Sequence, residues 1–157
     1  MILCDFAGSW AGTNGFRLMP GDPLAEAPAT VTVTTAAGGH LTLVAYTWAH
    51  PGDGQQDGLL MIAAAGEDAR DGSLVAVWGD SWHQKPATMS LPGGPAGEAS
   101  FVFAGDYGGG WGWRIRFDAT DPENLRMGMD NVIPAEHASG DEVAGPYPVM
   151  VMDVRRA

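Results

Sequence analysis

The sequence predicts an all-β protein, an antiparallel up-and-down β-barrel of about ten strands. Apolar residues recur at a spacing of two, or in short runs between turn signals, and this is the period of a β-strand. No segment shows the longer apolar period of an amphipathic helix. The 23 glycines and 11 prolines are spread over the whole chain, which indicates many turns between short elements.

Ten candidate strands follow from this pattern. They cover residues 6–18, 30–35, 41–48, 59–65, 74–81, 87–91, 100–104, 111–119, 125–132 and 148–155. Glycine- and proline-rich turn signals separate them, including residues 92–95 (Pro-Gly-Gly-Pro) and 108–110 (Gly-Gly-Gly). Residues 19–28 form a longer irregular stretch, and any helix there would be a short lid.

Ten strands joined by short connections are typical of a meander, whose two edges stay unpaired unless the sheet closes. Closure gives a barrel too wide for small side chains to fill, so we expect a ligand or water inside. A two-sheet sandwich is the alternative. The chain of 157 residues fits one domain, residues 1–157, with a substantial core.

The charge balance argues against polyanionic partners. Lys and Arg number 8 against 19 Asp and Glu, a formal net charge of −11. Nucleic acid and anionic membrane surfaces are therefore not expected as partners. Cys4 is the only cysteine, so no intramolecular disulfide can form. No signal peptide or long apolar span is visible, and we expect a cytoplasmic protein. The oligomeric state is open, with a homodimer as one alternative.

One strand shows which side chains face inward. Trp113, Ile115 and Phe117 alternate with Arg114 and Arg116. Strict alternation requires one buried and one polar face. We therefore expect the aromatic face inside the barrel and both arginines outside, although a carboxylate bound by the arginines inside the barrel is the alternative.

The first strand opens with the sequence Phe-Ala-Gly-Ser-Trp-Ala-Gly, in which the tryptophan is Trp10, and a central strand ends in Trp78-Gly-Asp80-Ser. These segments resemble the calycin superfamily of lipocalin-like and fatty-acid-binding-protein-like barrels. The resemblance is closest to a bacterial calycin-like domain family with no established activity. It implies that a basic side chain from the last strand, Arg155 or Arg156, packs across Trp10 where the barrel closes; we choose Arg155.

Nitrobindin-like haem proteins have a similar opening and ligate iron through one histidine near the C-terminal end. Here the last histidine is His137, in a polar segment instead of an apolar one. Haem is therefore the lesser alternative, no cofactor is expected, and no cluster of residues predicts a metal site.

The densest polar and aromatic segment starts at Trp78. In an extended strand, Trp78, Asp80 and Trp82 share one face, and Ser81 and His83 share the other. If the first three face inward, they form an aromatic slot with an anionic anchor, which suits a flat apolar ligand bearing a donor or a cation. Otherwise Trp78 is an ordinary core residue and Asp80 bonds the backbone of a turn.

The main hypothesis is a barrel that binds a small apolar or aromatic molecule. The predicted lining consists of Trp48, Trp78, Asp80, Trp113, Met127, Met129 and Met150. An enzyme of isomerase or cyclase type, using Asp80 or His83 as acid or base, is the alternative, since burial would raise the pKa of Asp80. A further alternative is a structural domain whose interior is filled by side chains. Asp130 is either a second interior anchor or a turn residue.

Overall fold

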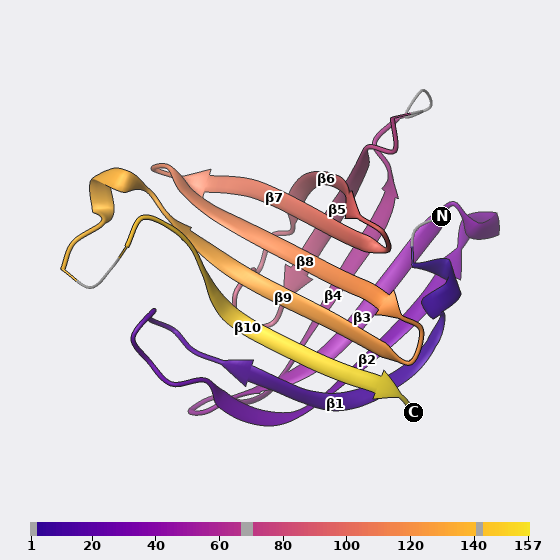
Figure 1. Cartoon of the computed structure of the whole chain (residues 1–157), viewed down its shortest axis with the longest axis horizontal. Helices are drawn as coiled ribbons and strands as arrows, with labels where there is room; N and C mark the ends of the chain where they lie inside the picture. Colours follow the sequence, from indigo (N-terminus) through magenta and orange to yellow (C-terminus); the bar gives the residue numbers. More distant parts are fainter. Residues whose placement is uncertain (1–2, 67–70, 141–142) are drawn as a thin grey trace.

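The computed structural model describes residues 3–66, 71–140 and 143–157, and these form a closed antiparallel β-barrel (Figure 1). The strands are β1 (Gly8–Phe16), β2 (Ala25–Ala36), β3 (Leu41–His50), β4 (Gly54–Ala64), β5 (Leu74–Asp80), β6 (Met89–Gly97), β7 (Ser100–Gly108), β8 (Trp111–Asp121), β9 (Asn124–Ile133) and β10 (Gly145–Arg156). The prediction of an up-and-down barrel of about ten strands is confirmed.

Helical structure in the described residues is limited to three short 3₁₀ turns. These are η1 (Cys4–Phe6), η2 (Ala37–Gly39) and η3 (Ala135–His137). None of them is long enough to cross a membrane. Residues 19–28 hold no helical lid; β2 already begins at Ala25, and Pro28 pairs with Thr13 inside it.

Every strand pairs with its neighbour in the chain, and β1 closes the barrel against β10. The closing register runs from Trp10 opposite Arg156 to Phe16 opposite Met150. Gly12 permits this close approach, because a Cβ there would lie 2.1 Å from the Asp153 carbonyl oxygen. The 3₁₀ turn η1 and the C-terminal end of β10 lie at the same end of the barrel (Figure 1).

The predicted turn at residues 92–95 is wrong, because these residues lie inside β6. Pro92 pairs with Val75, and Gly93 pairs with Leu74 and Phe103. Gly93 is needed there, since a Cβ would lie 2.1 Å from the carbonyl oxygen of Val102. The glycine thus serves close strand approach, and the chain turns later, where Ala99 has a φ of 52°.

The interior follows the predicted alternation of β8. Trp113, Ile115 and Phe117 are buried, and their neighbours Arg114 and Arg116 lie on the outer face. Both arginines donate to the carboxylate of Asp130, at 2.7 to 2.9 Å. Asp130 is therefore neither an interior anchor nor a turn residue. It sits in mid-strand on the outer face, buried beneath two guanidinium groups.

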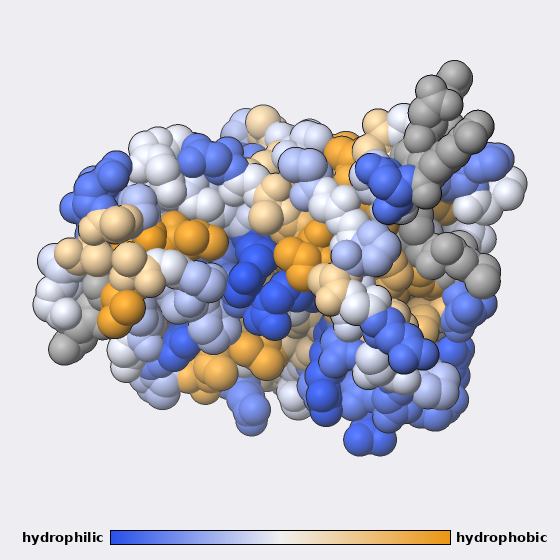
Figure 2. Space-filling model, turned by 45° about the horizontal axis from the view of Figure 1, so that its top comes forward, coloured by the Kyte–Doolittle hydropathy of each residue, from blue (hydrophilic) through white to orange (hydrophobic). Residues whose placement is uncertain are grey.

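The rest of the outer surface is mixed. On the face shown in Figure 2, hydrophobic residues occur in small groups between hydrophilic ones. Leu59, Met61 and Val151 are examples of partly exposed apolar side chains on outward-facing strand positions.

The end of the barrel that holds η1 is closed by side chains. η1 buries Phe6, which stacks on Trp10 with ring centroids 5.5 Å apart. The Trp10 indole N–H donates to the Phe6 carbonyl at 2.9 Å. The guanidinium of Arg156 lies 4.5 Å from the centre of the Trp10 ring. The prediction of Arg155 as the residue over Trp10 is therefore wrong. Arg156 pairs with Trp10, and Arg155 pairs with Ala11.

Candidate functional site

An open cavity of about 500 Å³ occupies the opposite end of the barrel. Its wall comes mainly from the ends of β5 to β10 and the residues that adjoin them. The lining residues are Leu18, Trp78, Trp82, His83, Gln84, Met89, Tyr107, Trp113, Asn131, Tyr147 and Val149. The wall is thus largely aromatic with a few polar groups, as is usual for small-molecule sites.

Two tryptophans form the flat part of this wall. Trp78 of β5 and Trp113 of β8 stack with ring centroids 5.3 Å apart and an interplanar angle of only 7°. Both point inward because they occupy buried positions in strictly alternating strands. Trp113 is only 8% exposed, and its Nε1 has no hydrogen-bond partner.

The chain turns sharply where β5 ends, and Asp80 organises the turn. Its Oδ1 accepts hydrogen bonds from the backbone N–H groups of Trp82 and His83, at 2.7 and 2.8 Å. Its own N–H donates to the Gln84 carbonyl. This turn breaks the extended geometry assumed in the sequence analysis. His83 therefore does not point to the face opposite Asp80, and its side chain returns to the interior, where it is only 6% exposed.

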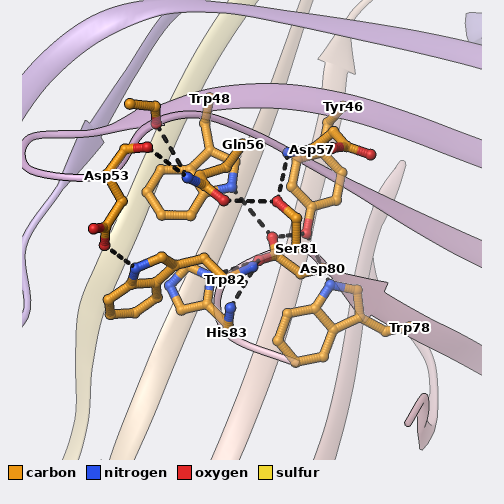
Figure 3. A network of polar contacts seen from close by, with 11 residues as sticks. Tyr46, Trp48, Asp53, Gln56, Asp57, Trp78, Asp80, Ser81, Trp82 and His83 are labelled. Carbon is orange, nitrogen blue, oxygen red and sulfur yellow. Dashed lines mark hydrogen bonds and ion pairs between the residues drawn. The ribbon is translucent and has the colours of Figure 1, made fainter. Parts of the chain in front are cut away.

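The other carboxylate oxygen of Asp80 anchors a buried network (Figure 3). Oδ2 accepts from the Tyr46 hydroxyl at 2.7 Å and from Trp48 Nε1 at 3.2 Å. Trp78 Nε1 donates in turn to the Tyr46 oxygen at 2.8 Å. Gly58 makes room for this arrangement, since a Cβ there would lie 2.2 Å from the Tyr46 hydroxyl.

These contacts fix the charge of Asp80. Burial raises its pKa, but the hydrogen bond and charge of His83, with the Tyr46 hydroxyl, outweigh burial and hold the pKa at about 2. Asp80 is therefore an ionised acceptor, and the expectation of a raised pKa is wrong. Burial and the nearby charge of Asp80 raise the pKa of Tyr46 well above its usual value, so Tyr46 stays a donor.

His83 connects this network to the cavity. Its Nδ1 lies 3.3 Å from Asp80 Oδ1. Its ring centroid lies 4.9 Å from that of Trp48 and 5.2 Å from that of Trp113. Nε2, the other ring nitrogen, is buried and has no partner.

The polar groups at the rim of the cavity satisfy one another. Tyr107 donates to Asn131 Oδ1 at 2.6 Å, and Asn131 donates to the Tyr147 hydroxyl at 3.3 Å. Tyr147 donates to the Leu18 carbonyl at 2.8 Å. In the cavity wall as far as the structure describes it, the buried polar side-chain atoms left without a partner are His83 Nε2 and Trp113 Nε1.

The structure divides the predicted lining into three groups. Trp78 and Trp113 line the cavity. Trp48 and Asp80 lie directly behind it, in contact with His83. Met127, Met129 and Met150 are buried in the core, and none of them lines this cavity. The methionines share the inward face as expected, but they lie toward the packed part of the interior.

The sequence analysis missed Tyr46, Tyr107, Asn131 and Tyr147. Tyr46 had a usable signal, because it lies two residues before Trp48 and therefore on the same face of β3. The rim residues had none, since they come together only when the ends of β7, β9 and β10 meet.

His137 does not fit the role of a haem ligand in this cavity. It is exposed in η3, and its ring stacks near Trp111 with centroids 5.6 Å apart. The described parts of the chain also hold no group of three or more metal-binding side chains. Comparison with known proteins adds no assignment, since no family model and no curated protein matches the chain.

Proposed function

We propose that this protein binds a small, flat, largely apolar molecule in the open cavity at the end of the barrel. The observation that carries the proposal is a space of about 500 Å³ walled by two parallel tryptophans, with two buried polar nitrogens that have no partner in the protein. Buried polar groups are normally paired, so such atoms favour a ligand that pairs with them.

The shape and chemistry of the wall restrict the ligand. Indole faces favour stacking or edge contact with another flat ring. The Asp80 carboxylate is behind His83 and already accepts five hydrogen bonds, so it leaves no free anion to bind a cation. These features favour a neutral aromatic ligand over a cationic one.

Titration with a neutral planar fluorophore, 1-aminoanthracene, tests the proposal. We expect a saturable increase in its fluorescence with one site per chain. Trp113→Leu should weaken binding by about tenfold, which corresponds to about 1.4 kcal/mol of lost contact. Trp111→Leu on the same strand is the matched control, because Trp111 lies against His137 and does not line the cavity.

Equal losses in the two variants, or binding that never saturates, would contradict a specific site in the cavity. Native mass spectrometry and an absorption spectrum of the protein purified from cells complete the test. A co-purifying molecule would identify the class of ligand, and a Soret band would assign the cavity to haem instead.

A further inference from the structure

The two unpartnered nitrogens of the cavity wall belong to side chains that are more than nine-tenths buried. The exposed fractions are 6% for the His83 side chain and 8% for Trp113. Leaving a buried polar group without a hydrogen-bond partner is energetically costly. A ligand that pairs with both atoms would therefore gain more than one that only stacks on the indoles.

The hydrogen-bonding role of His83 Nε2 follows from its neighbour. The Asp80 carboxylate is ionised and can only accept hydrogen bonds. The proton of a neutral His83 ring is therefore on Nδ1, where it points to Asp80 Oδ1. Nε2 then carries a lone pair and is an acceptor. Trp113 Nε1 is a donor only.

His83 and Trp113 both line the cavity, with ring centroids 5.2 Å apart, and between them they carry one unpaired acceptor and one unpaired donor. A hydroxyl group is the smallest ligand group that can satisfy both, since it donates one hydrogen bond and accepts another. A carbonyl or ether oxygen can pair with Trp113 but not with neutral His83.

We propose that the cavity binds a flat aromatic molecule bearing a hydroxyl group, which donates to His83 Nε2 and accepts from Trp113 Nε1. This inference rests on the proposed function and narrows its ligand class to phenols.

Asp80 is the charged group in direct contact with the His83 ring. Titratable groups near the site include the Tyr46 hydroxyl, which donates to Asp80, the Tyr107 and Tyr147 hydroxyls at the rim, which are hydrogen-bonded, and His50, which stacks on Trp82. Nδ1 of His50 accepts from the backbone N–H groups of Gly52 and Asp53, so His50 is not aimed at His83 through that atom.

A matched pair of probes tests the inference on the whole protein. 4-Nitrophenol and 4-nitroanisole differ only in a hydroxyl against a methoxy group, and both quench tryptophan fluorescence. We expect 4-nitrophenol to bind at least about tenfold more tightly, the effect of one satisfied hydrogen bond to a buried group.

His83→Phe keeps an aromatic ring at this position and removes Nε2. We expect it to abolish the preference for 4-nitrophenol over 4-nitroanisole. Trp113→Phe should weaken both probes, because both oxygens can accept from Trp113. His40→Phe, at an exposed histidine outside the cavity, is the control and should change neither.

Far-UV circular dichroism of the His83 variant checks that it is folded, and the comparison of probes on the unsubstituted protein needs no variant. Equal affinity for the two probes overturns the inference and leaves the proposed function standing. Failure of both probes and of 1-aminoanthracene to bind would overturn the proposed function as well.

Discussion

The two ends of the barrel each carry an inward-facing tryptophan, and the surroundings of these two tryptophans are opposite. At the closed end, the Trp10 N–H donates to the Phe6 carbonyl and the ring is covered by Phe6 and Arg156. At the open end, Trp113 stacks on Trp78 but faces a cavity, and its N–H has no partner. The indole N–H at the first end is paired within the protein, and the indole N–H at the second end is not.

This contrast separates residues that stabilise the barrel from residues that we expect to bind a ligand. Core tryptophans replaced by alanine cost stability through lost contacts and the cavity left behind. A tryptophan that already faces an open space loses fewer contacts. Paired substitutions at the two ends therefore make the comparison measurable.

The largest expected effect is at the closed end. Trp10→Ala should lower the free energy of unfolding by about 3–5 kcal/mol, measured by urea titration. Trp113→Ala should lower it by about 1–2 kcal/mol, because one side of the ring already meets the cavity. Equal losses at the two positions would contradict the distinction between the two ends.

The network behind the open end depends on one glycine. Gly58→Ala would place a Cβ 2.2 Å from the Tyr46 hydroxyl and force Tyr46 away from Asp80. We expect the free energy of unfolding to fall by about 3 kcal/mol, which is at the upper end of the range for overpacking. The near-UV circular dichroism spectrum should also change. Gly79→Ala is the control, since its Cβ would meet Thr88 at an ordinary 3.5 Å. A loss of the same size at Gly79 would argue against a specific role for the space around Tyr46.

The charge of Asp80 should appear as a dependence of stability on pH. Its pKa is lowered from 3.8 to about 2 in the folded protein. The ionised carboxylate therefore stabilises the fold above about pH 4, and this contribution, about 2 kcal/mol, disappears as the pH falls from about 4 to about 2.

Urea titrations of the protein and of Asp80→Asn between pH 6 and pH 2 check this dependence. The stability difference between the two should narrow by that amount toward low pH. Asp121→Asn reports the general effect of removing one exposed charge. A difference that stays constant with pH would show that Asp80 does not contribute through its ionised form.

The smallest expected effect concerns the cation at the closed end. Arg156→Ala removes the guanidinium over Trp10 and should cost about 1 kcal/mol. Arg155→Ala, one residue earlier and paired with Ala11, should stay within about 0.5 kcal/mol. If Arg155→Ala lost more stability than Arg156→Ala in thermal or urea unfolding, Arg155 would be the residue that stabilises the closure of the barrel.

Much of the barrel could be predicted from the sequence because strand periodicity is local. The alternation in β8 correctly placed Trp113, Ile115 and Phe117 inside and Arg114 and Arg116 outside. Local patterns failed where a residue type has two uses. The Pro-Gly-Gly-Pro segment has the composition of a turn, yet Gly93 serves a close approach of β6 to β7 that only the paired strands reveal.

The candidate site could be predicted only in part, because strand periodicity is local and the contacts between strands are not. The sequence by itself determined the strand count, the inward position of Trp113 and the acidic residue that ends β5, since these depend on spacing along one strand. Only the tertiary structure decided that Asp80 turns His83 back into the interior, and that Tyr46 and Trp48 from β3 bond its carboxylate. Barrel closure brings together groups about 30 residues apart, and the resulting hydrogen bonds set both the charge of Asp80 and the free nitrogen of His83.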